Sequence, residues 1–197
     1  QKWRVAKDLL AALAHAHHHG VVHRNLTPGA ILIGQDGTTR ITDFDFAKPG
    51  VDRSLTIATD IVDLVEKAYV APEAFREPGA ASSASDIFSA GVILYELFTG
   101  ERPFAGEPTT VWDRVGEFLN KPSALRPELN EAFDAWLQSL CAFDEHQRLT
   151  ASAALAALNA LLQPVAQVAN QRAETPEPEV FEVDDVQTDY LNLVAGH

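Results

Sequence analysis

Residues 21–45 read VVHRNLTPGAILIGQDGTTRITDFD, and this stretch decides the fold. Its two opening valines are β-branched and predict a short strand before a tight loop. The apolar run at 31–33 is followed by Asp36 and Gly37, a strong signal for a hairpin turn. Residues 39–42 then return as a second strand, so the pattern predicts a small antiparallel hairpin that ends in an acidic segment.

This stretch resembles the catalytic core of the protein kinase family, in which a loop H-R-D-L-x-x-x-N is followed by D-F-G. In this chain the loop reads His23-Arg24-Asn25-Leu26-Thr27-Pro28-Gly29-Ala30, and the acidic segment reads Asp43-Phe44-Asp45. The resemblance implies a mostly α fold, the C-terminal lobe of a kinase, with a small β-hairpin at the catalytic loop.

Three positions of the loop depart from the family in their chemistry. Asn25 replaces the aspartate that accepts or orients the substrate proton, and losing a positioned base typically costs about 10²- to 10⁴-fold in rate. Thr27 replaces the lysine that steadies the phosphate in serine/threonine kinases, and Ala30 replaces the asparagine that binds the second magnesium ion. These losses predict a catalytically inactive relative, a pseudokinase, with no catalytic residue.

Asp43 keeps the place of the metal-binding aspartate of D-F-G. We expect no bound cofactor in this chain. The resemblance implies that Asp43 alone could hold Mg²⁺ with ATP, and only in the full-length protein. Asp45 replaces the glycine of that motif, which removes a hinge and adds a negative charge that repels a nucleotide. The other interpretation is an ATP-binding enzyme of non-standard mechanism, in which Asp45 supplies a second metal oxygen.

Two strings far apart in the sequence resemble the family's structural ion pair. Residues 68–73 read AYVAPE and end in the acid Glu73, and residues 144–150 read DEHQRLT and contain Arg148. The resemblance implies a buried bidentate pair between Glu73 and Arg148, structural rather than catalytic. Removing one partner would leave a buried charge and cost about 3–5 kcal/mol.

The string DIFSAG at residues 86–91 resembles the central helix motif D-x-x-S-x-G, and TGERPF follows at 99–104. The resemblance implies that Asp86 caps the backbone amides of His23 and Arg24 and so anchors the loop. The alternative is an ordinary acid at a helix N-terminus. We expect His23 to be a packed structural residue and not an acid or base.

Residues 46–73 resemble an activation segment. Its hydroxyl groups at Ser54, Thr56 and Thr59 are candidate phosphorylation sites, and Arg24 could pair with a phosphate there. The alternative is an unmodified loop, since most loops carry hydroxyl groups.

Helical periodicity of apolar residues recurs along the rest of the chain. Gly20 is a candidate C-terminal cap for the first helix. The predicted helices cover residues 2–19, 60–68, 84–99, 109–119, 128–141 and 150–162.

His15 and His19 lie one helical turn apart and share a helix face, so they could bind a metal ion. The other interpretation is that both imidazoles interact with the negative end of the helix dipole. No cysteine or carboxylate cluster completes a metal site in the sequence, which favours the second interpretation.

The chain has 197 residues, of which 46% are hydrophobic, and a formal net charge of -13. Such a negative charge argues against nucleic acid or an anionic membrane as a partner. The one cysteine excludes an internal disulfide framework and favours a cytoplasmic protein, and no 18-residue apolar run occurs.

We expect a C-terminal lobe at 1–163 and an acidic linker or tail at 164–197, where prolines and acids replace the periodic pattern. The chain has no Met and no glycine-rich loop of a kinase small lobe, so we expect a segment of a longer, bacterial-type protein. The expected partners are its own upstream small lobe, further domains or another protein. The first functional hypothesis is a scaffold or allosteric module without phosphoryl transfer.

Overall fold

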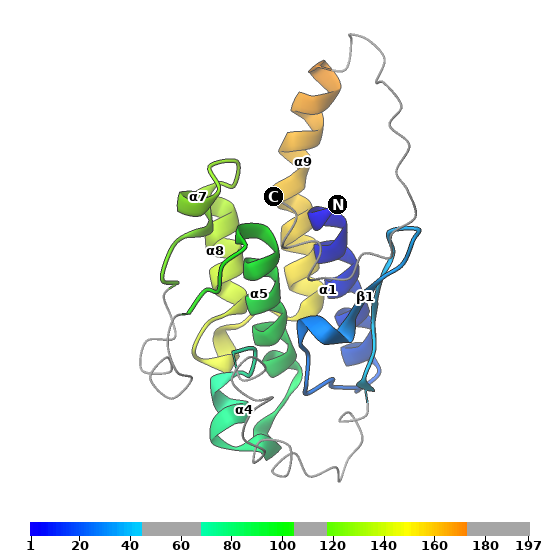
Figure 1. Cartoon of the computed structure of the whole chain (residues 1–197), viewed down its shortest axis with the longest axis vertical. Coiled ribbons are helices and arrows are strands. Elements are labelled where there is room, and N and C mark those ends of the chain that lie inside the picture. Colours follow the sequence, from blue (N-terminus) through cyan, green and yellow to red (C-terminus); the bar gives the residue numbers. More distant parts are fainter. Residues whose placement is uncertain (45–67, 105–117, 173–197) are drawn as a thin grey trace.

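The computed structural model describes residues 1–44, 68–104 and 118–172 of the chain. These residues form a helical lobe with one two-stranded sheet at its edge (Figure 1). The helices are α1 (Lys2–His18), α4 (Pro72–Arg76), α5 (Ser83–Thr99), α7 (Pro122–Leu125), α8 (Glu131–Leu140) and α9 (Ala151–Arg172). The strands are β1 (Ile31–Ile33) and β2 (Thr39–Ile41), and short 3-10 turns occur at Pro28–Ala30, Pro78–Ala80 and Glu145–Gln147.

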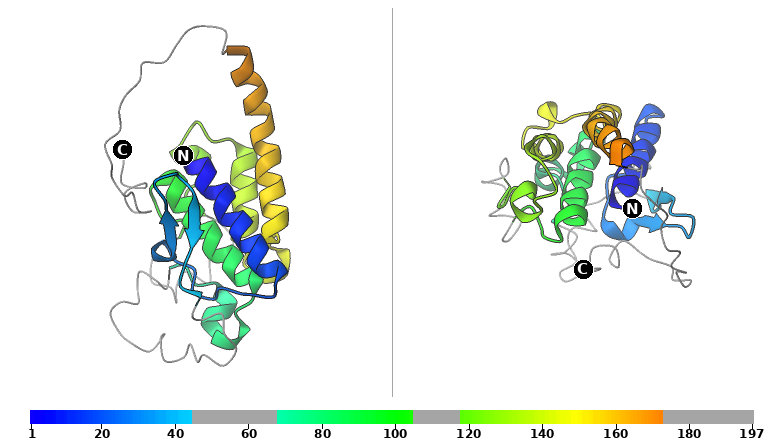
Figure 2. Two further views of the ribbon diagram at one scale, coloured as in Figure 1. Left: turned by 90° about the vertical axis from the view of Figure 1, so that its right-hand side faces the viewer. Right: turned by 90° about the horizontal axis from the view of Figure 1, so that it is seen from above.

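Helix α5 forms the centre of the lobe, with α8 on one side and α1 on the other (Figure 1). Helix α9 packs along α1 and also contacts α8, and its C-terminal part extends beyond the other helices (Figures 1 and 2). Because α5 is apolar on nearly every face, it must be enclosed to remove that surface from water. Accordingly, 14 of its residues are buried.

Both ends of α5 carry strong capping signals. Ser82 accepts a hydrogen bond from the Ala84 amide at 3.2 Å, and Ser85 accepts one from the Ser82 amide at 3.0 Å, which forms a capping box. At the other end Gly100 adopts φ +81°, a left-handed conformation that glycine tolerates without strain. These caps fix where the central helix begins and ends.

The hairpin forms where the turn signal predicts it. Ile31 pairs with Ile41 in antiparallel register, and Gly37 in the turn has φ +72°. Ile31 and Ile33 are buried, whereas Leu32 between them is 50% exposed. The strand therefore buries one face against the lobe and leaves the other face uncovered. The short strand predicted at residues 21–22 was wrong: neither residue is in a strand, and the Val21 amide donates to the carbonyl oxygen of Ala16 at 2.9 Å.

Several predicted helix bounds differ from the structure. The predicted helix at 150–162 begins at Ala151, with the Thr150 hydroxyl accepting from the Ala153 amide at 3.2 Å, and continues to Arg172. The linker predicted from 164 therefore starts with nine helical residues. The helix predicted at 60–68 lies outside the described residues except for Ala68, which is in a turn.

The helix predicted at 109–119 falls largely outside the described residues, and Phe118 and Leu119, which are described, are not helical. Two short helices, α4 and α7, were not predicted. Each begins at a proline, which is favourable at a first helical position, but each is too short for a periodic signal.

Cys141 is a free, fully buried thiol, and burial raises its pKa to about 12. Within the part of the chain that the structure describes, no helix is long and apolar enough to cross a membrane.

Candidate functional site: the loop at residues 23–30 and its supports

The ring of His23 is fully buried and both of its nitrogens are used in the loop. Nε2 lies 2.7 Å from the carbonyl oxygen of Thr42, which can only accept, so Nε2 carries the hydrogen. Nδ1 then accepts from the backbone amide of Asn25 at 3.3 Å. The ring also packs against Phe44, with centroids 4.7 Å apart. With both nitrogens engaged, His23 ties the loop to the end of β2 and is not placed for proton transfer.

Asp86, near the start of α5, is 1% exposed and holds the loop from the opposite side. Its Oδ2 accepts from the His23 amide at 2.8 Å, and its Oδ1 accepts from the Arg24 amide at 2.8 Å. The ring of His17, on the last turn of α1, donates from Nε2 to Oδ2 at 2.9 Å. A buried carboxylate requires such donors, and here three donors from two segments converge on it.

The three substituted positions lie on this supported loop. Asn25 and Thr27 are partly buried, whereas Ala30 is 3% exposed and packs in the core. The methyl group of Ala30 offers no oxygen to a metal ion, and the hydroxyl of Thr27 carries no charge to pair with phosphate. The loop backbone is held in place, but positions 25, 27 and 30 supply no strong base, no cation and no second metal ligand.

Asp43 follows β2 with an exposed side chain and φ +60°, and Arg24 has φ +69°. Non-glycine residues rarely adopt this left-handed region, and such strain clusters at functional sites. The Asp43 carboxylate accepts a hydrogen bond from the Thr42 hydroxyl at 3.1 Å. Asp43 is therefore a candidate oxygen ligand for a cation, and Asp45 lies outside the described residues.

No group of three or more His, Cys, Asp or Glu side chains within residues 1–44, 68–104 and 118–172 is arranged to hold a metal ion. The candidate phosphorylation sites Ser54, Thr56 and Thr59 also lie outside the described residues. Arg24 has its Nε buried without a hydrogen-bond partner in the described part of the chain.

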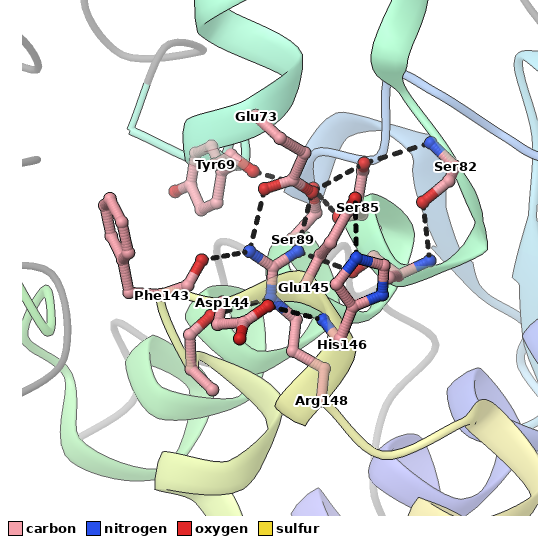
Figure 3. Close-up of polar contacts among 12 residues, drawn as sticks. Tyr69, Glu73, Ser82, Ser85, Ser89, Phe143, Asp144, Glu145, His146 and Arg148 are labelled. Atoms are coloured by element: carbon pink, nitrogen blue, oxygen red, sulfur yellow. Dashed lines mark hydrogen bonds and ion pairs between the residues drawn. The ribbon is translucent and has the colours of Figure 1, made fainter.

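Glu73 on α4 and Arg148 before α9 form a bidentate ion pair (Figure 3). Nη1 donates to Oε1 at 2.6 Å, and Nη2 donates to Oε2 at 2.8 Å. The remaining three N–H groups of Arg148 donate to the carbonyl oxygens of Ala142 at 2.7 Å, Ala84 at 3.0 Å and Phe143 at 3.2 Å. All five guanidinium donors are thus satisfied, which a side chain that is 0% exposed requires.

Further groups stabilise the charged form of this pair. Ser85 donates to Glu73 at 2.8 Å, and the guanidinium lies over the ring of Phe88, 5.1 Å from its centroid. Burial opposes ionisation of Glu73, but the hydrogen bonds and the charge of Arg148 outweigh it and lower its pKa. The pair joins α4, α5 and the segment before α9.

Four supports of the site were not predicted from the sequence: His17, Thr42, Ser85 and Phe88. His17 is one of three consecutive histidines, and no local pattern separates it from its neighbours. Its contact with Asp86 spans 69 positions, so it emerges only when α1 packs on α5. Ser85 also has little sequence signal, because the capping-box pattern usually has Glu or Gln at N3 and the motif DIFSAG begins one residue later.

The sequence model of the family described as "Protein kinase domain" matches residues 2–158. The chain belongs to the protein kinase family. This match covers the helical lobe and the first part of α9, and it agrees with the mostly helical architecture and the small hairpin.

Relatives with bacterial origins share about a third of the aligned residues. The chain is 33% identical over 148 residues to the probable serine/threonine-protein kinase PknB of Bifidobacterium longum, covering 74% of this chain and 21% of that protein. It is 36% identical over 132 residues to the serine/threonine-protein kinase PknL of Mycobacterium tuberculosis, and the alignment covers 66% of this chain and 32% of that protein.

A third relative is the DNA damage-responsive serine/threonine-protein kinase RqkA of Deinococcus radiodurans, 35% identical over 152 residues, with 76% of this chain and 22% of that protein covered. The chain therefore spans between 21% and 32% of the length of these three relatives.

Proposed function

We propose that this chain is the C-terminal lobe of a serine/threonine kinase-like protein that acts as a scaffold or allosteric module and does not transfer phosphate. The proposal is carried by one observation: the hydrogen bonds that hold the loop backbone are present, whereas the reactive groups of the loop are absent. Asp86 and His23 hold the loop backbone in place, while positions 25, 27 and 30 present an amide, a hydroxyl and a methyl group.

Relatives named as kinases support membership of the family and do not decide between an active and an inactive protein. The physical argument for inactivity is cumulative. An amide cannot act as a general base, a neutral hydroxyl cannot neutralise a transferring phosphate, and a methyl group cannot bind Mg²⁺. One such loss is compatible with a variant mechanism, whereas three on one loop remove most of the catalytic groups that the lobe contributes.

A second candidate function is ATP binding through Asp43 and one metal ion. The exposed carboxylate of Asp43 and its left-handed backbone favour this candidate. ATP binding requires an upstream small lobe. The scaffold role requires a partner, which is that small lobe, a further domain of the same protein or a separate protein. Like the scaffold role, ATP binding fits a cytoplasmic protein.

The decisive experiment measures phosphate transfer from radiolabelled ATP by the intact parent protein. We expect background transfer by the native protein and by Asp43→Ala. We expect measurable activity when Asn25→Asp, Thr27→Lys, Ala30→Asn and Asp45→Gly are combined, because they restore the three groups of the loop and remove the carboxylate that repels a nucleotide. Robust turnover by the native protein that Asp43→Ala abolishes would falsify the proposal.

Nucleotide binding separates the two candidates. Mg-ATP should leave the thermal midpoint of the intact parent unchanged if the lobe is an inert scaffold. A clear upward shift that is lost in Asp43→Ala, but kept in the exposed surface control Glu131→Gln, would support the ATP-binding candidate.

A further inference from the structure

Three exposed histidines cluster at the C-terminal end of α1. The rings of His15 and His19 lie with centroids 4.4 Å apart, and those of His18 and His19 lie 5.3 Å apart, nearly perpendicular. His17 is not available to this cluster, because its ring donates to Asp86. The loop and ion pair described above make no use of the cluster.

The hydrogen bonding of His19 fixes which of its nitrogens is free. Its Nδ1 lies 2.8 Å from the backbone carbonyl oxygen of His15, and because a carbonyl only accepts, Nδ1 carries the hydrogen. Nε2 therefore has an unshared electron pair in an exposed position. Histidines that bind metals usually donate their other ring N–H to a carbonyl or carboxylate in this way. The hydrogen bond thus fixes the orientation of the His19 ring and leaves it in the tautomer whose Nε2 can bind a metal ion.

The spacing and the local field also suit a cation. His15 lies in the last turn of α1 and His19 is the residue that follows the helix, and their rings lie side by side, close to the i, i+4 arrangement that two-histidine zinc sites use. Imidazole is a good ligand for zinc, nickel and copper ions. The C-terminal end of a 17-residue helix carries partial negative charge, which favours a bound cation.

We propose that His15 and His19 together bind one divalent transition-metal ion, Zn²⁺, Ni²⁺ or Cu²⁺, with water in the remaining positions. Two protein ligands are proposed because no three donors converge within the described residues. The exposed side chain of His15 needs only a rotation about its own bonds to direct a nitrogen at the ion that Nε2 of His19 holds. His18 packs edge-on against His19 and limits the rotation of that ring.

A metal ion bound by His15 and His19 would hold the last turn of α1 in its helical conformation, and this turn carries His17. Since His17 donates to Asp86 and Asp86 holds the amides of His23 and Arg24, the ion would stabilise the helix end that supports the loop. The site does not depend on whether the lobe transfers phosphate.

The test is calorimetric titration of the untagged parent protein with Zn²⁺ near neutral pH. We expect His15→Ala and His19→Ala each to weaken the same site by at least about tenfold. The control His146→Ala should leave binding unchanged, because the side chain of this histidine is 87% exposed and lies in the turn at Glu145–Gln147, outside α1. Circular dichroism checks that the variants fold. We expect them to fold, because the substituted side chains are exposed.

A second readout uses Cu²⁺ and electron paramagnetic resonance. Coordination by two imidazole nitrogens in the native protein, reduced to one in His15→Ala, is the expected result. Equal zinc affinity in the native protein, His15→Ala and His19→Ala would overturn the proposal, as would a copper spectrum that His15→Ala leaves unaltered.

Discussion

The guanidinium of Arg148 meets the carboxylate of Glu73, 75 positions earlier in the chain, through two hydrogen bonds of 2.6 and 2.8 Å. The pair lies beside the capped start of α5, where Ser85 adds a third hydrogen bond to Glu73 (Figure 3). It joins α4 and the start of α5 to the segment before α9, which is distant in sequence from both, so its contribution should be visible in the stability of the whole lobe.

Arg148→Lys should lower the free energy of unfolding by about 3–5 kcal/mol, because Lys has three donors where Arg148 uses five and cannot form the bidentate pair. Urea denaturation measures the change. The exposed residue Arg76, which lies over the ring of Phe143, offers a control: Arg76→Lys should cost less than about 0.5 kcal/mol. Equal small effects of both substitutions would show that the ion pair contributes little.

The stability of the lobe should also depend on pH through Glu73. Its pKa in the folded state is lowered from 4.5, so the group stabilises the fold above about pH 4.5 and this contribution is lost as the pH falls through the folded-state value. The difference in unfolding free energy between the native protein and Glu73→Gln should be constant near neutral pH and shrink in acid. A difference between the native protein and Glu73→Gln that grows in acid would contradict the assignment.

Asp86→Asn should loosen the loop. The amide has one acceptor oxygen where the carboxylate accepts three hydrogen bonds, so we expect a loss of about 2–4 kcal/mol. Hydrogen exchange should accelerate most at the amides of His23 and Arg24. His17→Phe removes only the imidazole donor and leaves the two backbone donors of Asp86 in place, so it should have a smaller effect on both measurements. Unchanged exchange at residues 23 and 24 in Asp86→Asn would show that the loop is held by other contacts.

Gly91 lies where α5 and α8 approach closely, and a Cβ there would meet the sulfur of Cys141 at 2.5 Å and Cβ of Leu140 at 3.0 Å. Gly91→Ala should therefore destabilise the protein by about 1–3 kcal/mol through overpacking. Adding Cys141→Ala removes the sulfur and should recover part of this loss, a non-additivity that a double-mutant cycle measures.

Gly79 is the matched control for this position, because a Cβ there meets no atom within 4 Å. Gly79→Ala should change the unfolding midpoint little. If both alanine variants unfold at the same urea concentration as the native protein, the close approach of α5 and α8 is not limiting.

The sequence was sufficient to predict features that depend on local patterns. Asp36-Gly37 indicated the hairpin turn, the apolar run at 84–99 indicated the buried central helix, and residue order identified the substituted positions of the loop. Each of these rests on neighbouring residues, where turn chemistry, helical periodicity and spacing act. The short helix α7 was missed because propensity over a few residues is a weak signal. The extension of α9 was missed because Pro164 is a residue that ordinarily ends a helix.

Only the tertiary structure decided how the polar groups are satisfied. Nothing near His17 in the sequence indicates that its ring reaches Asp86, and nothing near Arg148 fixes which three carbonyl groups share its donors with Glu73. The packing of the helices determines these partners. A buried charged group needs donors or acceptors within about 3 Å, and the fold determines which groups lie that close. The sequence by itself therefore determined the elements and the chemistry absent from the loop, and the packing of the helices determined what holds that loop in place.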